Sequence, residues 1–178
     1  METLDKKYII KRLLIAHKDI DFLMFQEIKV TGFQLDIALK CIWEDAKPFS
    51  TNHERGRGGT SIPINLKWKN LVVDWGSSPC NRVVWVVLEN QGNKFGVCWS
   101  YAPNDHMSRV SLSKWMSLLH NITWKIVGDF NMIESQQDNV GGCKFERKGD
   151  EKLFWNSMIS KYLLFDPLIR KKSEHKGI

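Results

Sequence analysis

The chain has 178 residues, of which 43% are hydrophobic and 26% charged, a composition that is typical of one folded domain and excludes a disordered chain. Its formal net charge of +6 and pI of about 9.1 suit a polyanionic partner such as nucleic acid. The longest apolar run, Val83 to Leu88, is far too short to span a bilayer, and the first residues lack the apolar core of a secretory signal, so we expect an intracellular protein without a membrane partner.

The first part of the chain alternates between helical and extended patterns. Apolar residues at helical spacing predict an amphipathic helix over residues 3–17 and a shorter helix over residues 35–42. Between them, the apolar run from Ile20 to Gln26 predicts a strand that is buried on both faces. The glycine-rich residues 55–59 indicate a turn.

The second part of the chain is predicted to be extended before it ends in helices. A helix containing residues 112–119 follows the strands, with Asp105 or Ser108 as its N-cap. A core strand then ends at Asp129, and a last helix covers residues 150–162 with Asp150 as its cap. The whole pattern predicts a mixed α/β domain. The extended stretches are residues 60–65, 70–75, 82–89 and 94–101, with a hairpin connection at residues 90–93 between the last two.

The four cysteines do not form a metal-binding or disulfide pattern. No two of them are close enough for a CxxC pair, so neither a zinc site nor a disulfide framework is expected. We interpret them as reduced thiols that are mostly buried. They are Cys41, Cys80, Cys98 and Cys143.

Two short motifs place polar side chains at the ends of predicted strands. Phe25-Gln26-Glu27 ends an apolar strand in a carboxylate, and Mg²⁺ prefers one or two carboxylates completed by water and phosphate oxygens. Tyr101 closes a long strand and begins the sequence Tyr-Ala-Pro-Asn, where its hydroxyl could bond a phosphate oxygen. Taken singly, the first motif is more typical of a solvated glutamate after a strand, and the second is more typical of a packing tyrosine.

A third motif, Gly128-Asp129-Phe130-Asn131, is the most specific. Because residues two apart on a strand share a face, we expect Asp129 and Asn131 to point the same way while Phe130 turns to the core. Gly128 allows the backbone to approach a neighbour closely. An Asp that orients water beside an amide that holds a phosphate oxygen is suited to phosphodiester hydrolysis, although a plain polar turn is the alternative.

The order and spacing of the three motifs resemble the endonuclease/exonuclease/phosphatase superfamily, and in particular the endonuclease domain of plant LINE-type (non-LTR) retrotransposons. The resemblance covers most of the chain and includes Gly58-Gly59 and the stretch that follows Asn131. It implies a DNase I-like α/β fold, a two-sheet sandwich flanked by helices, over residues 1–178 as a single domain.

The resemblance also implies a role for each motif residue. Glu27 would bind the divalent metal, Mg²⁺ or alternatively Mn²⁺, with support from Gln26. Tyr101 would contact the scissile phosphate, Asp129 would orient or deprotonate the attacking water, and Asn131 would hold a phosphate oxygen.

Two elements of the family pattern are absent, so the domain is expected to be incomplete at both ends. The W-N-x-R strand that usually begins the domain is missing, and so is the S-D-H motif that usually ends it. Ser173-Glu174-His175 looks similar to S-D-H, but it comes too early and no strand precedes it, so we interpret it as a solvated basic tail.

Duplex DNA is the expected substrate, with RNA as the alternative, and Arg57 and Asn104 are candidate contacts to nucleic acid. A nuclear location and a monomer are expected for the folded chain. The sequence leaves two hypotheses open: a Mg²⁺-dependent DNA endonuclease, or an inactive retroelement remnant that binds nucleic acid weakly.

Overall fold

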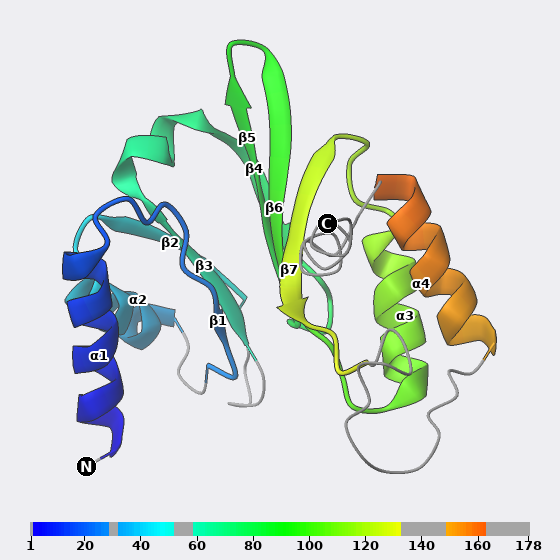
Figure 1. Ribbon diagram of the computed structural model, residues 1–178, viewed down its shortest axis with the longest axis horizontal. Helices are drawn as coiled ribbons and strands as arrows, with labels where there is room; N and C mark the ends of the chain where they lie inside the picture. The colour runs from blue at the N-terminus through cyan, green and yellow to red at the C-terminus, as the bar shows by residue number, and fades with distance from the viewer. Residues whose placement is uncertain (1, 29–31, 52–58, 133–148, 163–178) are drawn as a thin grey trace, which may run out of the picture. The chain divides into compact units, whose positions relative to one another are not determined.

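The structure is a computed structural model that describes residues 2–28, 32–51, 59–132 and 149–162 (Figure 1). The described residues form two compact units. The first unit comprises the residues up to Pro103 together with Ile122 to Met132, and the second comprises Asn104 to Asn121 and the last helix. The three motifs identified in the sequence therefore lie almost wholly in the first unit.

The first unit contains a three-stranded antiparallel sheet with two helices beside it (Figure 1). Its strand order is β1-β3-β2, and the central strand β3 is buried from Thr60 to Ile64. Helix α2 packs against both α1 and β2. The elements are α1 (Glu2–Ala16), β1 (Phe25–Gln26), α2 (Gly32–Ile42), β2 (Ala46–Ser50) and β3 (Thr60–Asn65).

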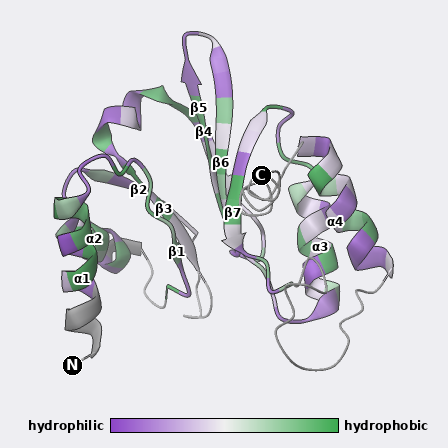
Figure 2. Ribbon diagram, in the orientation of Figure 1, coloured by the Kyte–Doolittle hydropathy of each residue, from purple (hydrophilic) through white to green (hydrophobic). Residues whose placement is uncertain are grey.

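A four-stranded sheet completes the first unit, in the order β4-β5-β6-β7. Its strands are antiparallel except for the parallel pair β6 and β7. The turn between β5 and β6 is Gln91-Gly92, whose φ values of 50° and 77° are those of a tight hairpin turn, and its tip is hydrophilic in Figure 2. The elements are the 3-10 helix η1 (Leu66–Leu71), β4 (Val72–Ser77), β5 (Val83–Asn90), β6 (Asn93–Tyr101) and β7 (Thr123–Asp129).

The two sheets pack face to face around an apolar core, as the sandwich prediction requires. Two hydrogen bonds also join the sheets. The indole Nε1 of Trp99 donates to the carbonyl of Phe25 at 3.0 Å, and the hydroxyl of Thr51 donates to the carbonyl of Asn81 at 3.2 Å. The α/β sandwich is therefore confirmed. Its buried core residues are Phe49, Ile62 and Ile64 from one sheet and Val84, Val86, Leu88 and Val97 from the other.

The second unit is a pair of helices, α3 (His106–Met116) and α4 (Gly149–Tyr162). Asp105 is the N-cap of α3, because its carboxylate accepts a bond from the amide of Ser108 at 2.8 Å. Buried Glu151 pairs with Arg109 at 2.5 Å and joins the helices. No described helix combines the length and the apolar character that crossing a membrane would require.

Several local predictions were wrong in instructive ways. The run from Ile20 to Gln26 forms a regular strand only at its last two residues, and none of its side chains is fully buried because β1 is an edge strand with one neighbour. Strand β2 was not predicted, since Lys47 and Pro48 interrupt its apolar pattern. Pro48 is tolerated because β2 is the other edge.

The predicted start of the last helix and the predicted burial of the cysteines also need correction. Helix α4 begins at Gly149, so Asp150 lies inside the first turn, where its carboxylate contacts His106 at 3.0 Å. Cys98 is buried, and burial raises the pKa of its thiol, but Cys41 and Cys80 are exposed. These three are free thiols, as predicted, and Cys143 lies outside the described residues.

Candidate active site

Glu27 directly follows β1 and has a left-handed backbone, with a φ of 55°. The residue before it, Gln26, pairs with Thr60 of β3, and the amide of Ile28 donates to the carbonyl of Gly59 at 3.2 Å. A Cβ on Gly59 would lie 2.9 Å from the carbonyl oxygen of Ile28, and the φ of Gly59 is 117°. Glycine therefore permits the close approach of Ile28 to Gly59, next to the exposed Glu27 at the end of the sheet.

Tyr101 brings the second sheet to Glu27. It is the last residue of β6 and pairs with Asp129 of β7. Its phenol hydroxyl donates to Oε1 of Glu27 at 2.5 Å, across the two sheets. The bond between Trp99 and Phe25 lies just before this contact on both strands, so it holds the strand ends together.

Three charged side chains, Glu27, Asp129 and Arg82, lie close enough to Tyr101 to affect the pKa of its phenol. The hydrogen bond to the Glu27 carboxylate raises the pKa of the phenol, and partial burial and the negative charges of Glu27 and Asp129 raise it further. The guanidinium of Arg82 opposes this rise. Tyr101 is therefore a neutral hydroxyl donor at physiological pH.

Arg82 is a site residue that the motifs did not reveal. Its guanidinium lies 5.1 Å from the centre of the Tyr101 ring, and Nη1 donates to the carbonyl of Tyr101 at 3.5 Å. In return, the amide of Tyr101 donates to the carbonyl of Arg82 at 2.8 Å. The only signal in the sequence was its position just before the apolar run of β5, which pairs with β6.

Asp129 and Asn131 lie together, but not for the predicted reason. Strand β7 ends at Asp129, and Asn131 has a φ of 48°, so the two residues do not share one strand face. Instead, the amide of Asn131 donates to Oδ1 of Asp129 at 2.9 Å, and its Nδ2 donates to the carbonyl of Ala102 at 2.6 Å. A tight turn, fixed to the chain after β6, therefore presents both side chains.

Gly128 provides the close approach that was predicted for it. A Cβ at this position would lie 1.9 Å from the carbonyl oxygen of Ser100 on the paired strand β6. Only glycine lets β7 lie at this distance. The same pairing aligns Tyr101 with Asp129, so Gly128 sets the geometry of the site.

The remaining predicted site residues are less central. Gln26 is exposed on β1 next to Glu27. Asn104 belongs to the second unit, where its side chain is exposed and its backbone carbonyl accepts a bond from Arg109. Arg57 and the segment Ser173-Glu174-His175 lie outside the described residues.

The carboxylates of this site fit a weakly coordinated hard cation. No cluster of three or more His, Cys, Asp or Glu side chains suited to a metal occurs among the described residues. Glu27 and Asp129 are both exposed near Tyr101. Mg²⁺ needs only one or two protein carboxylates, because water and substrate phosphate complete its shell, so this donor set suits Mg²⁺ better than a tightly caged metal.

The fold defined by these sheets is found in solved proteins of the endonuclease/exonuclease/phosphatase class. No protein-family model and no curated protein matches the chain. Among solved structures, a family protein from Bacteroides thetaiotaomicron is similar with a TM-score of 0.52 and 17% identity, over 73% of this chain and 56% of that one.

Two further structures are similar at the same level. A functionally unknown conserved protein from Enterococcus faecalis has a TM-score of 0.54 and 17% identity, over 74% of this chain and 60% of that one. A humanized D. rerio TDP2 has a TM-score of 0.53 and 15% identity, over 79% of this chain and 64% of that one. The chain thus spans less than two thirds of the length of each protein and shares their fold.

Proposed function

We propose that this chain is a divalent-metal-dependent phosphodiesterase that hydrolyses nucleic acid, with duplex DNA as its substrate. The observation that carries the proposal is the contact between Tyr101 and Glu27 beside the turn of Asp129 and Asn131. These residues come from the ends of three strands in two sheets. Functional side chains are held most rigidly when they stand on such regular elements.

Each side chain has a role that its chemistry supports. Glu27 is exposed and offers a carboxylate to the metal, with Gln26 beside it. Tyr101 keeps its proton at neutral pH and can donate it in a hydrogen bond to a phosphate oxygen. Asp129 is exposed and is the candidate to orient the attacking water or to accept its proton.

Substrate binding requires two of these groups to change or share partners. The hydroxyl of Tyr101 must turn from Glu27 to a phosphate oxygen, which frees Oε1 of Glu27. Asn131 already donates from Nδ2 to Ala102, and an amide nitrogen has a second hydrogen that remains for a phosphate oxygen. A bound Mg²⁺ would polarise the phosphate and stabilise the charge that develops on its oxygens.

Arg82 adds a positive charge to this site. Because its guanidinium lies against the ring of Tyr101, it favours an anionic group near the phenol hydroxyl. Together with the positive net charge of the chain, this supports a polyanionic substrate. The motif resemblance to LINE-type endonucleases supports duplex DNA over RNA and a retroelement origin.

A comparison of substrates tests the proposal. The purified chain is incubated with labelled duplex DNA, single-stranded DNA and single-stranded RNA of one sequence, with Mg²⁺, with Mn²⁺ and with EDTA. We expect metal-dependent cleavage that is fastest on the duplex and that Glu27→Gln abolishes, whereas the exposed and distant Lys40→Gln leaves it intact. Cleavage that persists in EDTA would contradict the proposed chemistry.

One observation favours a second candidate function, nucleic-acid binding without turnover. The only described histidine of the first unit is His17, which lines a different pocket, so the described part of this unit supplies no histidine to Glu27 and Tyr101. Residues of a catalytic unit act together, and the loss of one removes most of the rate. Retention of the duplex in a gel-shift experiment, without any cleavage in Mg²⁺, would favour this candidate.

A further inference from the structure

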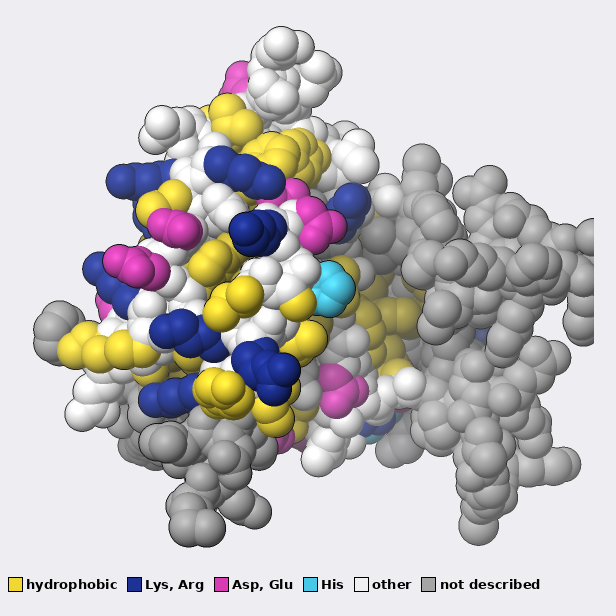
Figure 3. Space-filling view, turned by 60° about the vertical axis from the view of Figure 1, so that its left-hand side comes forward, with side chains coloured by type: hydrophobic (Ala, Val, Ile, Leu, Met, Phe, Trp, Pro, Cys, Tyr) yellow, Lys and Arg dark blue, Asp and Glu magenta, His cyan; other side chains and the backbone are white. Residues whose placement is uncertain are grey.

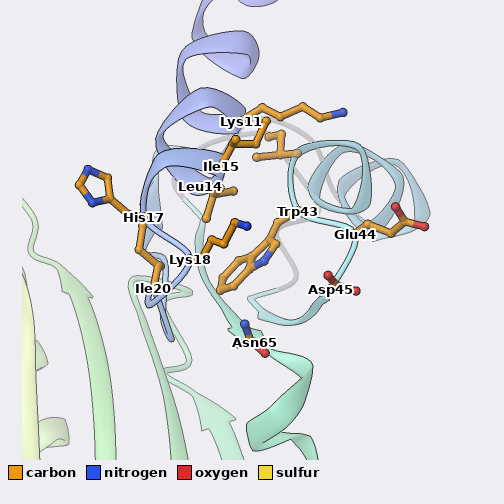
Figure 4. Close-up of a pocket in the computed structure, with 11 residues that line it drawn as sticks. Lys11, Leu14, Ile15, His17, Lys18, Ile20, Trp43, Glu44, Asp45 and Asn65 are labelled. Atoms are coloured by element: carbon orange, nitrogen blue, oxygen red, sulfur yellow. The ribbon is translucent and has the colours of Figure 1, made fainter.

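The first unit contains a hollow away from Glu27. It has a volume of about 400 Å³ and lies between the C-terminal ends of α1 and α2 (Figure 4). The indole of Trp43 extends into it, beside Leu14 and Ile15 of α1. Trp43 is partly exposed, and its indole is the aromatic side chain that lines the hollow.

The hollow and Glu27 lie at opposite ends of the three-stranded sheet. Asn65, at the end of β3, lines the hollow, whereas Thr60, at the start of β3, pairs with Gln26 next to Glu27. Five residue steps of extended strand separate these ends, which is a distance of about 17 Å. The hollow is thus a separate site rather than an extension of the first.

Charges of both signs surround the hollow without neutralising each other. Lys11 and Lys18 come from α1 and the residues after it, and Glu44 and Asp45 from the residues after α2, and all four are exposed. None of these four side chains forms an ion pair with another residue in the described part of the chain. A ligand could therefore engage both the cations and the carboxylates.

The surface beyond the hollow favours an anionic ligand on the lysine side. Figure 3 shows Lys and Arg side chains, with Asp and Glu side chains between them, among hydrophobic ones on the face that includes α1 and α2. From Lys6 to Lys18 the sequence contains five Lys or Arg residues and no acidic one. Lys11 and Lys18 would attract an anionic group, whereas Asp19, which follows Lys18, and Glu44 and Asp45 on the rim oppose one elsewhere.

We propose that this hollow binds a nucleotide, either a free nucleoside phosphate or one nucleotide of a single strand. The base stacks on the indole of Trp43, which suits any base because every base has a flat π face. The phosphate lies against Lys11 and Lys18. The carboxylates of Glu44 and Asp45 accept hydrogen bonds from the ribose hydroxyls or from the amino group of the base.

This ligand explains the whole set of lining residues better than simpler ones do. An inorganic anion would use the lysines but not Trp43, and two carboxylates on the rim would oppose it. An acidic peptide would face the same repulsion from Glu44 and Asp45 along its length. A nucleotide combines one anionic end, one flat aromatic body and several hydrogen-bond donors.

Magnetic resonance of the isotope-labelled chain in EDTA tests the proposal without any need for catalysis. The chain has eight tryptophans, and Trp43→Phe identifies the indole signal of Trp43 among them. The probes are 5′-GMP, 5′-AMP, 5′-CMP and 5′-UMP, each titrated to millimolar concentration beside inorganic phosphate and a single-stranded tetranucleotide. We expect the nucleotides to shift the Trp43 signal and the residues that line the hollow.

Variants assign the contacts. Lys18→Glu and Trp43→Ala should each weaken nucleotide binding roughly tenfold or more, whereas Lys40→Glu, an exposed charge reversal on α2 outside the lining, should not. Trp43→Phe keeps an aromatic face and should retain most of the affinity, so a folding defect in Trp43→Ala does not decide the result. A tighter response to the tetranucleotide than to every mononucleotide would identify a strand as the natural source.

Three results would overturn the proposal. One is the absence of any nucleotide-induced shift at Trp43. Another is an equal shift with inorganic phosphate, which would reduce the hollow to an anion site. The third is unchanged affinity in Lys18→Glu. Because the titration contains no free divalent metal, failure of DNA cleavage does not affect its outcome, and failure here leaves the Glu27 site untouched.

Discussion

Substitution of Gly128 by alanine should disrupt the pairing of β6 and β7 and with it the candidate active site. A Cβ at Gly128 would lie 1.9 Å from the oxygen of Ser100 and 2.8 Å from its carbonyl carbon. Both atoms are backbone, so no side chain can rotate away. Contacts below 3.0 Å essentially do not occur for real Cβ atoms, so β7 would have to move by more than an ångström.

The size of the effect follows from what that movement breaks. Overpacking of this kind costs about 1–3 kcal/mol. Loss of two ladder hydrogen bonds adds about 1 kcal/mol each, so we expect the free energy of unfolding to fall by roughly 3–5 kcal/mol. The hydrogen bond from the amide of Ala102 to the carbonyl of Asp129, 2.7 Å in the structure, would be lost as well.

Urea denaturation of Gly128→Ala measures this cost. The matched control is Gly149→Ala, because a Cβ at Gly149 would meet no atom within 4 Å. The control should unfold at the urea concentration of the original chain, and Gly128→Ala should unfold much earlier. A loss below about 1 kcal/mol in Gly128→Ala, within the range of ordinary surface substitutions and small defects, would refute the reasoning.

Three further predictions concern named contacts. In a spectroscopic titration of the three tyrosines, Glu27→Gln should lower the pKa of Tyr101 toward its ordinary value, since the Glu27 carboxylate is the main cause of the rise. Because the pKa of Tyr101 is raised in the folded state, the stability that its hydrogen bond contributes should be lost as the pH rises above the ordinary pKa of tyrosine. An unchanged titration in Glu27→Gln would contradict the contact. Trp99→Phe should cost about 1 kcal/mol in urea denaturation, because the carbonyl of Phe25 loses its donor, and no cost would indicate that the two sheets do not depend on this bond. Glu151→Gln should cost about 2 kcal/mol, because Arg109 loses its charged hydrogen bond to a buried carboxylate, whereas the exposed neighbour variant Lys152→Gln should cost little. Equal stability of both variants would refute a structural ion pair between the helices.

Much of the fold could be predicted because its strands carry strong local patterns. The apolar run of β5 is buried on both faces, and the turn at Gln91-Gly92 requires left-handed backbone that glycine tolerates well. Helix α3 has Asp105 as its cap, one of the two residues that the sequence offered for this position. These features depend on neighbours in sequence, so the sequence alone is sufficient to find them.

The edges of the three-stranded sheet could not be predicted, since they depend on tertiary pairing. Strand β2 contains Lys47 and Pro48, which local preference places outside sheets, and only its pairing with β3 makes it a strand. Strand β1 is reduced to two residues for the converse reason: its apolar side chains pack without regular pairing, and Phe22 forms an isolated bridge with Ile64. An apolar pattern predicts burial more reliably than it predicts hydrogen bonding.

In the candidate site, too, local features could be predicted from the sequence, and features that depend on tertiary contacts could not. The motifs identified Glu27, Tyr101, Asp129 and Asn131, and the structure brings all four to one end of the first unit. The turn at Asn131 could not be predicted, because the contact that accompanies its left-handed φ is with the carbonyl of Ala102, which follows β6 and is distant in sequence. Arg82 was missed for a similar reason, since only its cross-strand contact with Tyr101 identifies it as a site residue.

The most direct test of the central claim is nicking of supercoiled plasmid DNA by the purified, folded chain in Mg²⁺, with EDTA and Asp129→Ala as controls. Asp129 is exposed at the end of β7, so its replacement should leave the fold intact, which a matching denaturation curve would verify. The account predicts relaxed circles in Mg²⁺ that disappear both with EDTA and with Asp129→Ala. Equal nicking by Asp129→Ala would show that Asp129 has no part in catalysis and would contradict the site proposed for this chain.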